Sequence, residues 1–112
     1  MNVLVVDGQG GRVGQTIVEQ LFDSKCDCDI TVVGTNALAT AAMLKAGATA
    51  GATGENPVRV AAATADVIMG PLGILAANSL LGEITPGIAL AVLESAAQKV
   101  LVPVNKCSIT VV

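Results

Sequence analysis

The chain has 112 residues, of which 53% are hydrophobic and 13% charged, and its formal net charge is −3. With one Phe and no Trp or Tyr, it lacks the basic patches and stacking aromatic side chains typical of nucleic-acid-binding proteins. The negative charge also disfavours binding to an anionic membrane surface. Since the chain has no histidine, Ser-His-Asp triads, Cys-His dyads and histidine metal ligands are excluded.

The length predicts a single domain, residues 1–112. The longest uncharged run, Val67 to Gly82, is shorter than the roughly 18–20 residues that a transmembrane helix needs. The N-terminus has neither the basic start nor the apolar stretch of a signal peptide. These features predict a cytoplasmic protein.

The first apolar run, Val3–Val6, ends at Asp7-Gly8 and predicts a buried parallel strand. Residues 12–23 carry apolar side chains at helical spacing and predict a helix. The β-branched run Ile30–Val33 predicts the second strand. A second helix is expected at Ala37–Ala46, capped by Thr35 or Asn36 at its start and by Gly47 at its end.

The middle of the chain is ambiguous. Residues 47–56 fit either a short strand followed by a loop or a loop throughout, and residues 57–64 have no clear pattern. The apolar run Val67–Met69 predicts a third strand, and a helix is expected at Ile74–Leu81.

Thr85-Pro86 has the residue types of a helix cap and a first helical position, which predicts a helix from there to about Lys99. A strand at Val100–Val104 follows, and Ile109–Val112 is expected to return as an antiparallel edge strand. Strands that alternate with helices predict a parallel sheet with right-handed crossovers. The expected fold is therefore α/β, a Rossmann-like three-layer sandwich with a mostly parallel sheet of about five to six strands and a C-terminal edge strand.

The turn after the first strand is glycine-rich and resembles a phosphate-binding turn. Glycine permits a tight turn and a close approach of backbone N–H groups to a phosphate, and the start of the helix contributes partial positive charge. Arg12 would add a fixed cation, and Gly14 would let the helix pack closely on the sheet. The cofactor-binding residues predicted in this turn are Gly8, Gln9, Gly10, Gly11, Arg12 and Gly14. Gly11→Val is expected to abolish binding and to leave the fold largely intact. The alternative is a tight turn that holds no ligand.

This turn is similar to the first turn of the dihydrodipicolinate reductases, which continues in a Gly-Arg-x-Gly pattern and binds NADH or NADPH. The likeness covers about the first 25 residues. A dinucleotide-binding turn usually has Asp or Glu at the end of the second strand, but this chain has Gly34-Thr35-Asn36 there. NADP held by Arg12 with Thr35 or Asn36, or a mononucleotide, remains open as the ligand.

A second glycine turn, Gly70-Pro71-Leu72-Gly73, follows the third predicted strand, and Gly70 and Gly73 are further candidates for ligand contacts. Glu55 is solvated, accepts a hydrogen bond from a ribose hydroxyl, or acts as a base. Glu83, like Asn78, is a polar break in an apolar stretch; Glu83 either pairs with the start of a helix or lines the crevice, or is simply exposed.

The three cysteines are expected to be reduced. Cys26 and Cys28 precede the second strand and Cys107 follows the last predicted parallel strand, so they lie at opposite ends of the sheet. A five-residue strand spans about 16–17 Å, so these cysteines predict no metal site. Cys107 beside Lys106 is either a reactive thiol or a packed one.

As a whole, the sequence resembles an uncharacterised family of small proteins from clostridial-type anaerobic bacteria. This resemblance implies a cytoplasmic bacterial protein and assigns no catalytic residue. The matching stretches are Val6–Gly11, Gly34–Thr40, Gly54–Asn56, Gly70–Ile74, Ala77–Pro86 and Pro103–Cys107.

Three functions remain open at this point. The first is a phosphate-bearing nucleotide or dinucleotide binding protein with a sensor or regulatory role. The second is a small NAD(P)-dependent reductase whose pocket is completed by oligomerisation. The third is a structural oligomer with no ligand in the glycine turn. The apolar composition predicts a homo-oligomer, with a dimer favoured.

Overall fold

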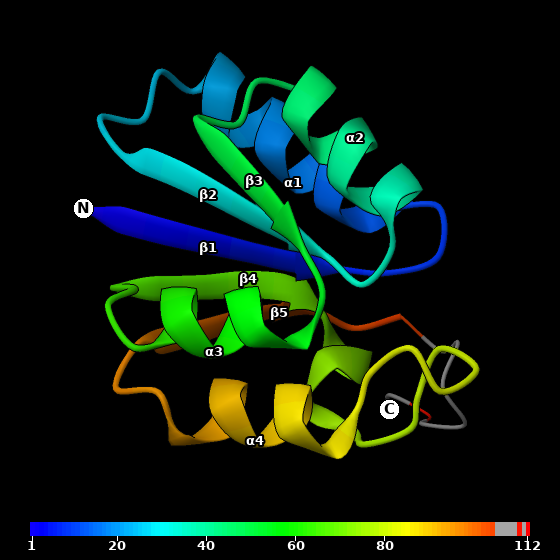
Figure 1. Cartoon of the computed structure of the whole chain (residues 1–112). Helices are drawn as coiled ribbons and strands as arrows, with labels where there is room; N and C mark the ends of the chain where they lie inside the picture. The colour runs from blue at the N-terminus through cyan, green and yellow to red at the C-terminus, as the bar shows by residue number, and fades with distance from the viewer. Residues whose placement is uncertain (105–109, 111) are drawn as a thin grey trace.

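The computed structural model describes residues 1–104, 110 and 112. Five strands in this part of the chain form one all-parallel sheet in the order β3-β2-β1-β4-β5 (Figure 1). The strands are β1 (Asn2–Asp7), β2 (Asp29–Gly34), β3 (Ala50–Thr53), β4 (Val67–Pro71) and β5 (Gln98–Val102). The expected antiparallel edge strand at 109–112 falls mainly outside the described residues.

Helices cover both faces of the sheet, as Figure 1 shows. The helices α1 (Arg12–Asp23) and α2 (Ala37–Lys45) lie on one face, and α3 (Glu55–Ala62) and α4 (Pro86–Glu94) lie on the other. The Rossmann-like three-layer sandwich is thus confirmed, as are the two helices expected before β3. The ambiguous segments resolve into β3 and α3.

The central strand β1 is buried on both sides, which explains its uninterrupted apolar sequence. Val3 and Val5 pack toward α1 and α2, whereas Leu4 and Val6 pack toward α3 and α4. Each of these four side chains is at most 3% exposed. The strand that leads into the glycine turn is therefore held in place by packing on both of its faces.

Two helix starts are capped as the sequence predicts. The Asn36 side chain accepts a hydrogen bond from the N–H of Ala39 at 2.9 Å, and the Thr85 hydroxyl accepts one from the N–H of Ile88 at 3.1 Å. These bonds satisfy backbone donors that have no partner within the helix. They fix the chain direction at the carboxyl end of β2 and at the entry to α4.

The prediction of a helix at Ile74–Leu81 is wrong. A short 3₁₀ helix, η1 (Leu72–Leu75), is followed by a loop of successive turns, residues 76–85. Asn78, Leu80 and Leu81 have left-handed backbone angles, and the N–H of Asn78 donates to the carbonyl of Ile84 at 2.6 Å. This 76–85 loop buries Leu80 and Ile84 in the core, which a regular helix at this position need not do.

The boundary between the last helix and the last strand is earlier than predicted. Helix α4 ends at Glu94 rather than at Lys99, because Ser95 is extended and its hydroxyl donates to the carbonyl of Ala62 at 2.6 Å. Strand β5 therefore begins at Gln98, whose N–H donates to the carbonyl of Asp66 at 3.0 Å. Pairing with β4 outweighs the helical pattern of residues 95–99.

The structure joins Cys26 and Cys28 in a disulfide, with their Cα atoms 5.4 Å apart. That separation lies within the range a disulfide can span, so the prediction of reduced thiols is wrong for this pair. Both residues lie before β2, at the amino end of the strand, as the sequence predicts. Cys107 lies outside the described residues.

No helix in the described part of the chain combines the length and apolar character needed to cross a bilayer.

Candidate functional site

The candidate site is built around the turn that joins β1 to α1. The N–H of Gly11 donates to the carbonyl of Gly8 at 2.9 Å and closes the turn. Gln9 has a left-handed φ of 50°, and Gly11, with φ 71°, is the residue that immediately precedes α1. A left-handed angle at a non-glycine residue is uncommon and is held only where surrounding contacts enforce it.

Asp7, at the end of β1, organises this turn from beneath. Its buried carboxylate accepts hydrogen bonds from the N–H of Gly8 at 2.8 Å and from the N–H of Gly14 at 2.7 Å. The first bond fixes the start of the turn and the second fixes the first turn of α1. The carboxylate therefore locks the angle at which the helix leaves the sheet.

A cleft of about 240 Å³ opens at this turn. It lies at the carboxyl ends of β1 and β4, which are neighbours in the sheet although their following segments leave toward opposite faces. Such a switch point is the place where open α/β sheets bind ligands. The residues that line it are Asp7, Gly8, Gln9, Gly10, Gly11, Arg12, Val13, Pro71, Leu80 and Val104.

An added Cβ would come within 3 Å of a neighbouring atom at three of the four glycines in the turn region, and at Gly11 that atom belongs to the backbone. A Cβ on Gly8 would lie 2.7 Å from the Thr35 hydroxyl, and one on Gly11 would lie 2.7 Å from the Cα of Ala39. A Cβ on Gly14 would lie 2.4 Å from the sulfur of Met43. Contacts within the molecule therefore explain why these positions lack side chains.

Gly10 differs from the other three. An added Cβ would have only the Cγ of Arg12 within 4.0 Å, and Gly10 is not among the glycines with a left-handed φ. The residue is exposed and lines the cleft. Neither the backbone conformation nor the packing of the fold requires glycine here.

A second polar cluster lies beside the turn and is centred on Glu83, from the 76–85 loop. Its Oε1 atom accepts hydrogen bonds from the N–H of Gln9 at 2.8 Å, the hydroxyl of Thr35 at 2.5 Å and the side-chain amide of Asn36 at 3.0 Å. The same Asn36 amide also donates to the carbonyl of Gln9 at 2.9 Å. These bonds tie the glycine turn, the carboxyl end of β2 and the 76–85 loop together.

The environment of Glu83 favours its charged form. Partial desolvation of the carboxylate raises its pKa, but the hydrogen bonds from Thr35, the Gln9 amide and Asn36 together lower the pKa below its ordinary value. Glu83 is therefore ionised at neutral pH and places a negative charge beside the turn.

The structure separates the residues predicted to contact a ligand into three groups. Gly8, Gln9, Gly10, Gly11 and Arg12 line the cleft together. Thr35 and Asn36 lie next to it and bind Glu83. The remaining three, Gly14, Gly70 and Gly73, do not line it.

Gly70 and Gly73 have structural surroundings of their own. A Cβ on Gly70 would lie 2.3 Å from the carbonyl oxygen of Val6, so the close pairing of β1 and β4 requires glycine there. Gly73 is buried in η1, and its carbonyl accepts the hydroxyl of Ser79 at 2.5 Å. The second glycine turn contributes Pro71 to the cleft rather than these two residues.

Glu55 lies away from the cleft, at the start of α3. Its carboxylate accepts the Thr85 hydroxyl and pairs with Arg59 at 2.9 Å. The hydrogen bond from Thr85 lowers the pKa of Glu55, and Arg59 lowers it further, against a smaller opposing effect of desolvation. In the structure Glu55 thus joins the start of α3 to the start of α4.

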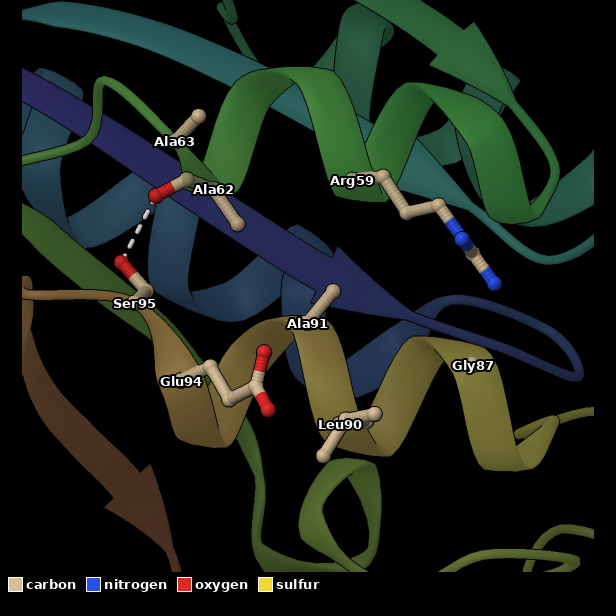
Figure 2. Close-up of a pocket in the computed structure, with 8 residues that line it drawn as sticks. All are labelled: Arg59, Ala62, Ala63, Gly87, Leu90, Ala91, Glu94 and Ser95. Carbon is tan, nitrogen blue, oxygen red and sulfur yellow. Dashed lines mark hydrogen bonds between the residues drawn. The ribbon is translucent and has the colours of Figure 1, made fainter.

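A groove of about 340 Å³ runs between α3 and α4 (Figure 2). Arg59 lies at the end near Gly87, and Glu94 lies at the other end of α4. Leu90 stands between them on α4, and the Ser95–Ala62 hydrogen bond closes the far end. This groove is distinct from the cleft at the glycine turn.

Sequence reasoning missed part of the site. In the sequence, Asp7 is a polar residue and Pro71 a proline at the end of an apolar strand. The two residues lie in one cleft because β1 pairs with β4. Nothing in the sequence identifies Leu80 and Val104 as residues that line a cleft, because an apolar residue in a loop can have many packing roles. Glu83 was expected to pair with a helix start or to line the crevice, and it contacts the turn that precedes α1.

Residues 2–112 match the family described as Domain of unknown function (DUF3842). The chain belongs to this family. The expectation of an uncharacterised family is thus confirmed. No curated protein and no solved structure matches the chain, so the similarity of the first turn to dihydrodipicolinate reductases has no counterpart in these comparisons.

Proposed function

We propose that this DUF3842 protein binds a phosphate-bearing nucleotide in the cleft at the carboxyl ends of β1 and β4 and acts as a sensor or regulatory module. The observation that carries the proposal is Gly10. It lines the cleft without a side chain, although the fold leaves room for one. A ligand that approaches the backbone closely explains this, because a phosphate held by N–H groups leaves no room for a Cβ.

The positive charge at the start of α1 and on Arg12 supports the same ligand, and it stands beside the negative charges of Asp7 and Glu83. The start of α1 contributes partial positive charge, and its first turn contains no acidic residue. Arg12, the first residue of α1, is exposed and lines the cleft, so its guanidinium is available to a phosphate oxygen. Asp7 is directed to the N–H groups of Gly8 and Gly14 beneath the turn.

The cleft continues along α1. A second hollow of about 380 Å³ shares Arg12 and Val13 with it and extends past Thr16 and Ile17 to Val102. This extension provides space for the part of the ligand beyond the phosphate. Among the described residues that line the cleft, the ionisable side chains are Asp7 and Arg12, which is why the proposal is binding and not a reaction.

The direct test is a thermal-shift screen of the purified protein against NADH, NADPH, ATP, GTP, FMN and coenzyme A. A ligand present at 100 times its Kd stabilises the folded state by about 2.7 kcal/mol. That stabilisation raises the Tm of a domain of this size by on the order of 10 °C. No shift with any of the six, each at millimolar concentration, would contradict the proposal.

We also propose that the protein is a homodimer formed through the groove between α3 and α4. Val60, Leu90 and Leu93 on these helices are 64%, 54% and 54% exposed. Arg59 and Glu94 lie at opposite ends of the groove (Figure 2). A two-fold axis near Leu90 would bring Arg59 of each copy to Glu94 of the other, as a self-complementary interface requires.

Leu90→Glu is expected to convert the dimer into a monomer, because the carboxylate would be buried at the centre of the interface. Sedimentation equilibrium measures the mass directly. The matched control is Leu38→Glu, which adds the same charge to an exposed leucine of α2, on the opposite face. A wild-type protein that sediments as a monomer, or a Leu90→Glu variant that remains dimeric, would rule out this interface.

A further inference from the structure

We infer that Glu83 accepts hydrogen bonds from the ribose of the bound nucleotide and selects ligands with free 2′- and 3′-hydroxyl groups over 2′-phosphorylated ones. The inference rests on the proposed nucleotide-binding function and places the ribose at the edge of the cleft, because Glu83 is not a lining residue but bonds to the N–H of Gln9, which is one. The structural basis is that one carboxylate from the 76–85 loop is fixed between the glycine turn and the carboxyl end of β2.

The position of this carboxylate is the first argument. Proteins that bind a dinucleotide at such a turn usually bind the ribose through an acidic residue at the end of the second strand. In this chain Thr35 and Asn36 occupy that place, and neither is acidic. Both side chains donate hydrogen bonds to Glu83, which lies 48 positions after Thr35 in the sequence. Glu83 therefore places a negative charge at the carboxyl end of β2.

The second argument is how the two carboxylate oxygens are used. All three hydrogen bonds to Glu83 end on Oε1. Within residues 1–104, 110 and 112, no hydrogen bond is made to Oε2. The first oxygen therefore anchors the side chain, and the second remains available to accept a hydroxyl proton. The free Oε2 atom has two lone pairs and can accept from both hydroxyl groups of an adjacent ribose diol.

The third argument is charge. A 2′-phosphate placed against the Glu83 carboxylate would bring two negative groups together in a partly buried setting. This repulsion disfavours NADPH, so the ligand chemistry narrows to a ribonucleotide with an unmodified diol. The adjoining hollow along α1 leaves space for the second half of a dinucleotide such as NADH.

The loop that carries Glu83 is held against the turn by more than this carboxylate. Leu80 is buried and approaches the Cα of Gly8 closely, since a Cβ built there would lie 3.1 Å from its Cδ1 atom. Asn78, Leu80 and Leu81 adopt left-handed angles that L-residues rarely hold without support. The position of Glu83 is thus set before the ligand arrives.

The experiment uses Glu83→Gln, because glutamine keeps a carbonyl oxygen for the three existing donors and replaces only the free oxygen with an amide. Kd values for NADH and NADPH, which differ by one 2′-phosphate, are measured by calorimetry on the full chain. ADP and 2′-deoxy-ADP serve as a second pair that differs by one hydroxyl. We expect the wild type to prefer NADH and ADP by about tenfold or more within each pair.

In Glu83→Gln, both preferences are expected to fall to less than about threefold, chiefly through weaker binding of NADH and ADP. Glu19→Gln, on the exposed surface of α1, is the control for loss of one negative charge and should keep the wild-type ratios. Because a ratio of two ligands on the same variant is measured, a general loss of stability in Glu83→Gln would not mimic the result. The Tm of the free variant records any such loss separately.

Three outcomes would overturn the inference. If the wild type binds NADPH as tightly as NADH, or if Glu83→Gln leaves both ratios unchanged, Glu83 does not contact the ribose. If Glu83→Gln binds all four nucleotides more tightly, the carboxylate competes with the ligand for the turn instead of recognising it. In all three cases nucleotides still bind and the proposed function stands, whereas binding of none of the four would remove the function and the inference together.

Discussion

Gly10→Val is expected to abolish nucleotide binding and leave the fold intact. The valine side chain would extend from the exposed turn into the cleft, where it would occupy the space through which a phosphate reaches the backbone. We expect Kd to rise by about 100-fold or more, which corresponds to roughly 2.7 kcal/mol. Calorimetry with the nucleotide that gives the largest thermal shift measures this change.

The stability of Gly10→Val is expected to change by no more than about 0.5–1 kcal/mol, since the added side chain meets only the Cγ of Arg12 at 4.0 Å. Gly10→Ala provides a graded comparison, with a smaller side chain at the same point and a smaller loss of affinity. Wild-type affinity in Gly10→Val would show that no phosphate approaches residue 10, and the proposed binding site would be wrong.

Gly11→Val is expected to have the opposite effect and to destabilise the fold. The residue has a left-handed φ of 71°, and its Cβ would lie 2.7 Å from the Cα and 2.9 Å from the carbonyl oxygen of Ala39. Backbone strain of about 1–3 kcal/mol and overpacking of about 1–3 kcal/mol combine at this position. Small domains have unfolding free energies of about 5–15 kcal/mol, so urea denaturation should show a large drop in the midpoint.

The expectation that Gly11→Val leaves the fold largely intact is therefore wrong, because the sequence does not reveal that α2 packs directly over the turn. Loss of binding in this variant would say nothing about a phosphate site. Val13→Ala, two residues further on in the first turn of α1 and only half-buried, is a control for disturbance near the turn and should lose much less stability. Wild-type stability in Gly11→Val would contradict the packing of α1 against α2.

Much of the fold could be predicted because local signals and tertiary packing agree. Strand β1 contains a continuous apolar run and β2 a β-branched run, and Asn36 and Thr85 are capping residues in both the sequence and the structure. Where the two disagree, prediction fails. Residues 95–99 continue a helical pattern, yet pairing with β4 draws Gln98 into a strand.

The candidate site could be predicted only in part, for a related reason. The glycine turn is contiguous in the sequence, so Gly8 to Arg12 were found together. Their partner Glu83 lies 74 positions from Gln9 and follows a segment whose composition resembles a helix. The turns of the 76–85 loop bring that carboxylate back to the glycine turn, and two of their left-handed angles occur at Leu80 and Leu81, a residue type that does not predict them.

The central place of β1 has a consequence for how the chain folds. Val3 pairs with Val67, so β1 cannot complete its pairing within the sheet until the chain has been synthesised as far as β4. Until α4 has also been synthesised, Leu4, Val6 and Val33 lack the cover that this helix provides. Such non-local pairing slows folding and prolongs the exposure of apolar strand faces. Nascent chains that stop before β4 therefore expose an incomplete sheet with an apolar, aggregation-prone face, whereas chains that extend past α4 can bury that face.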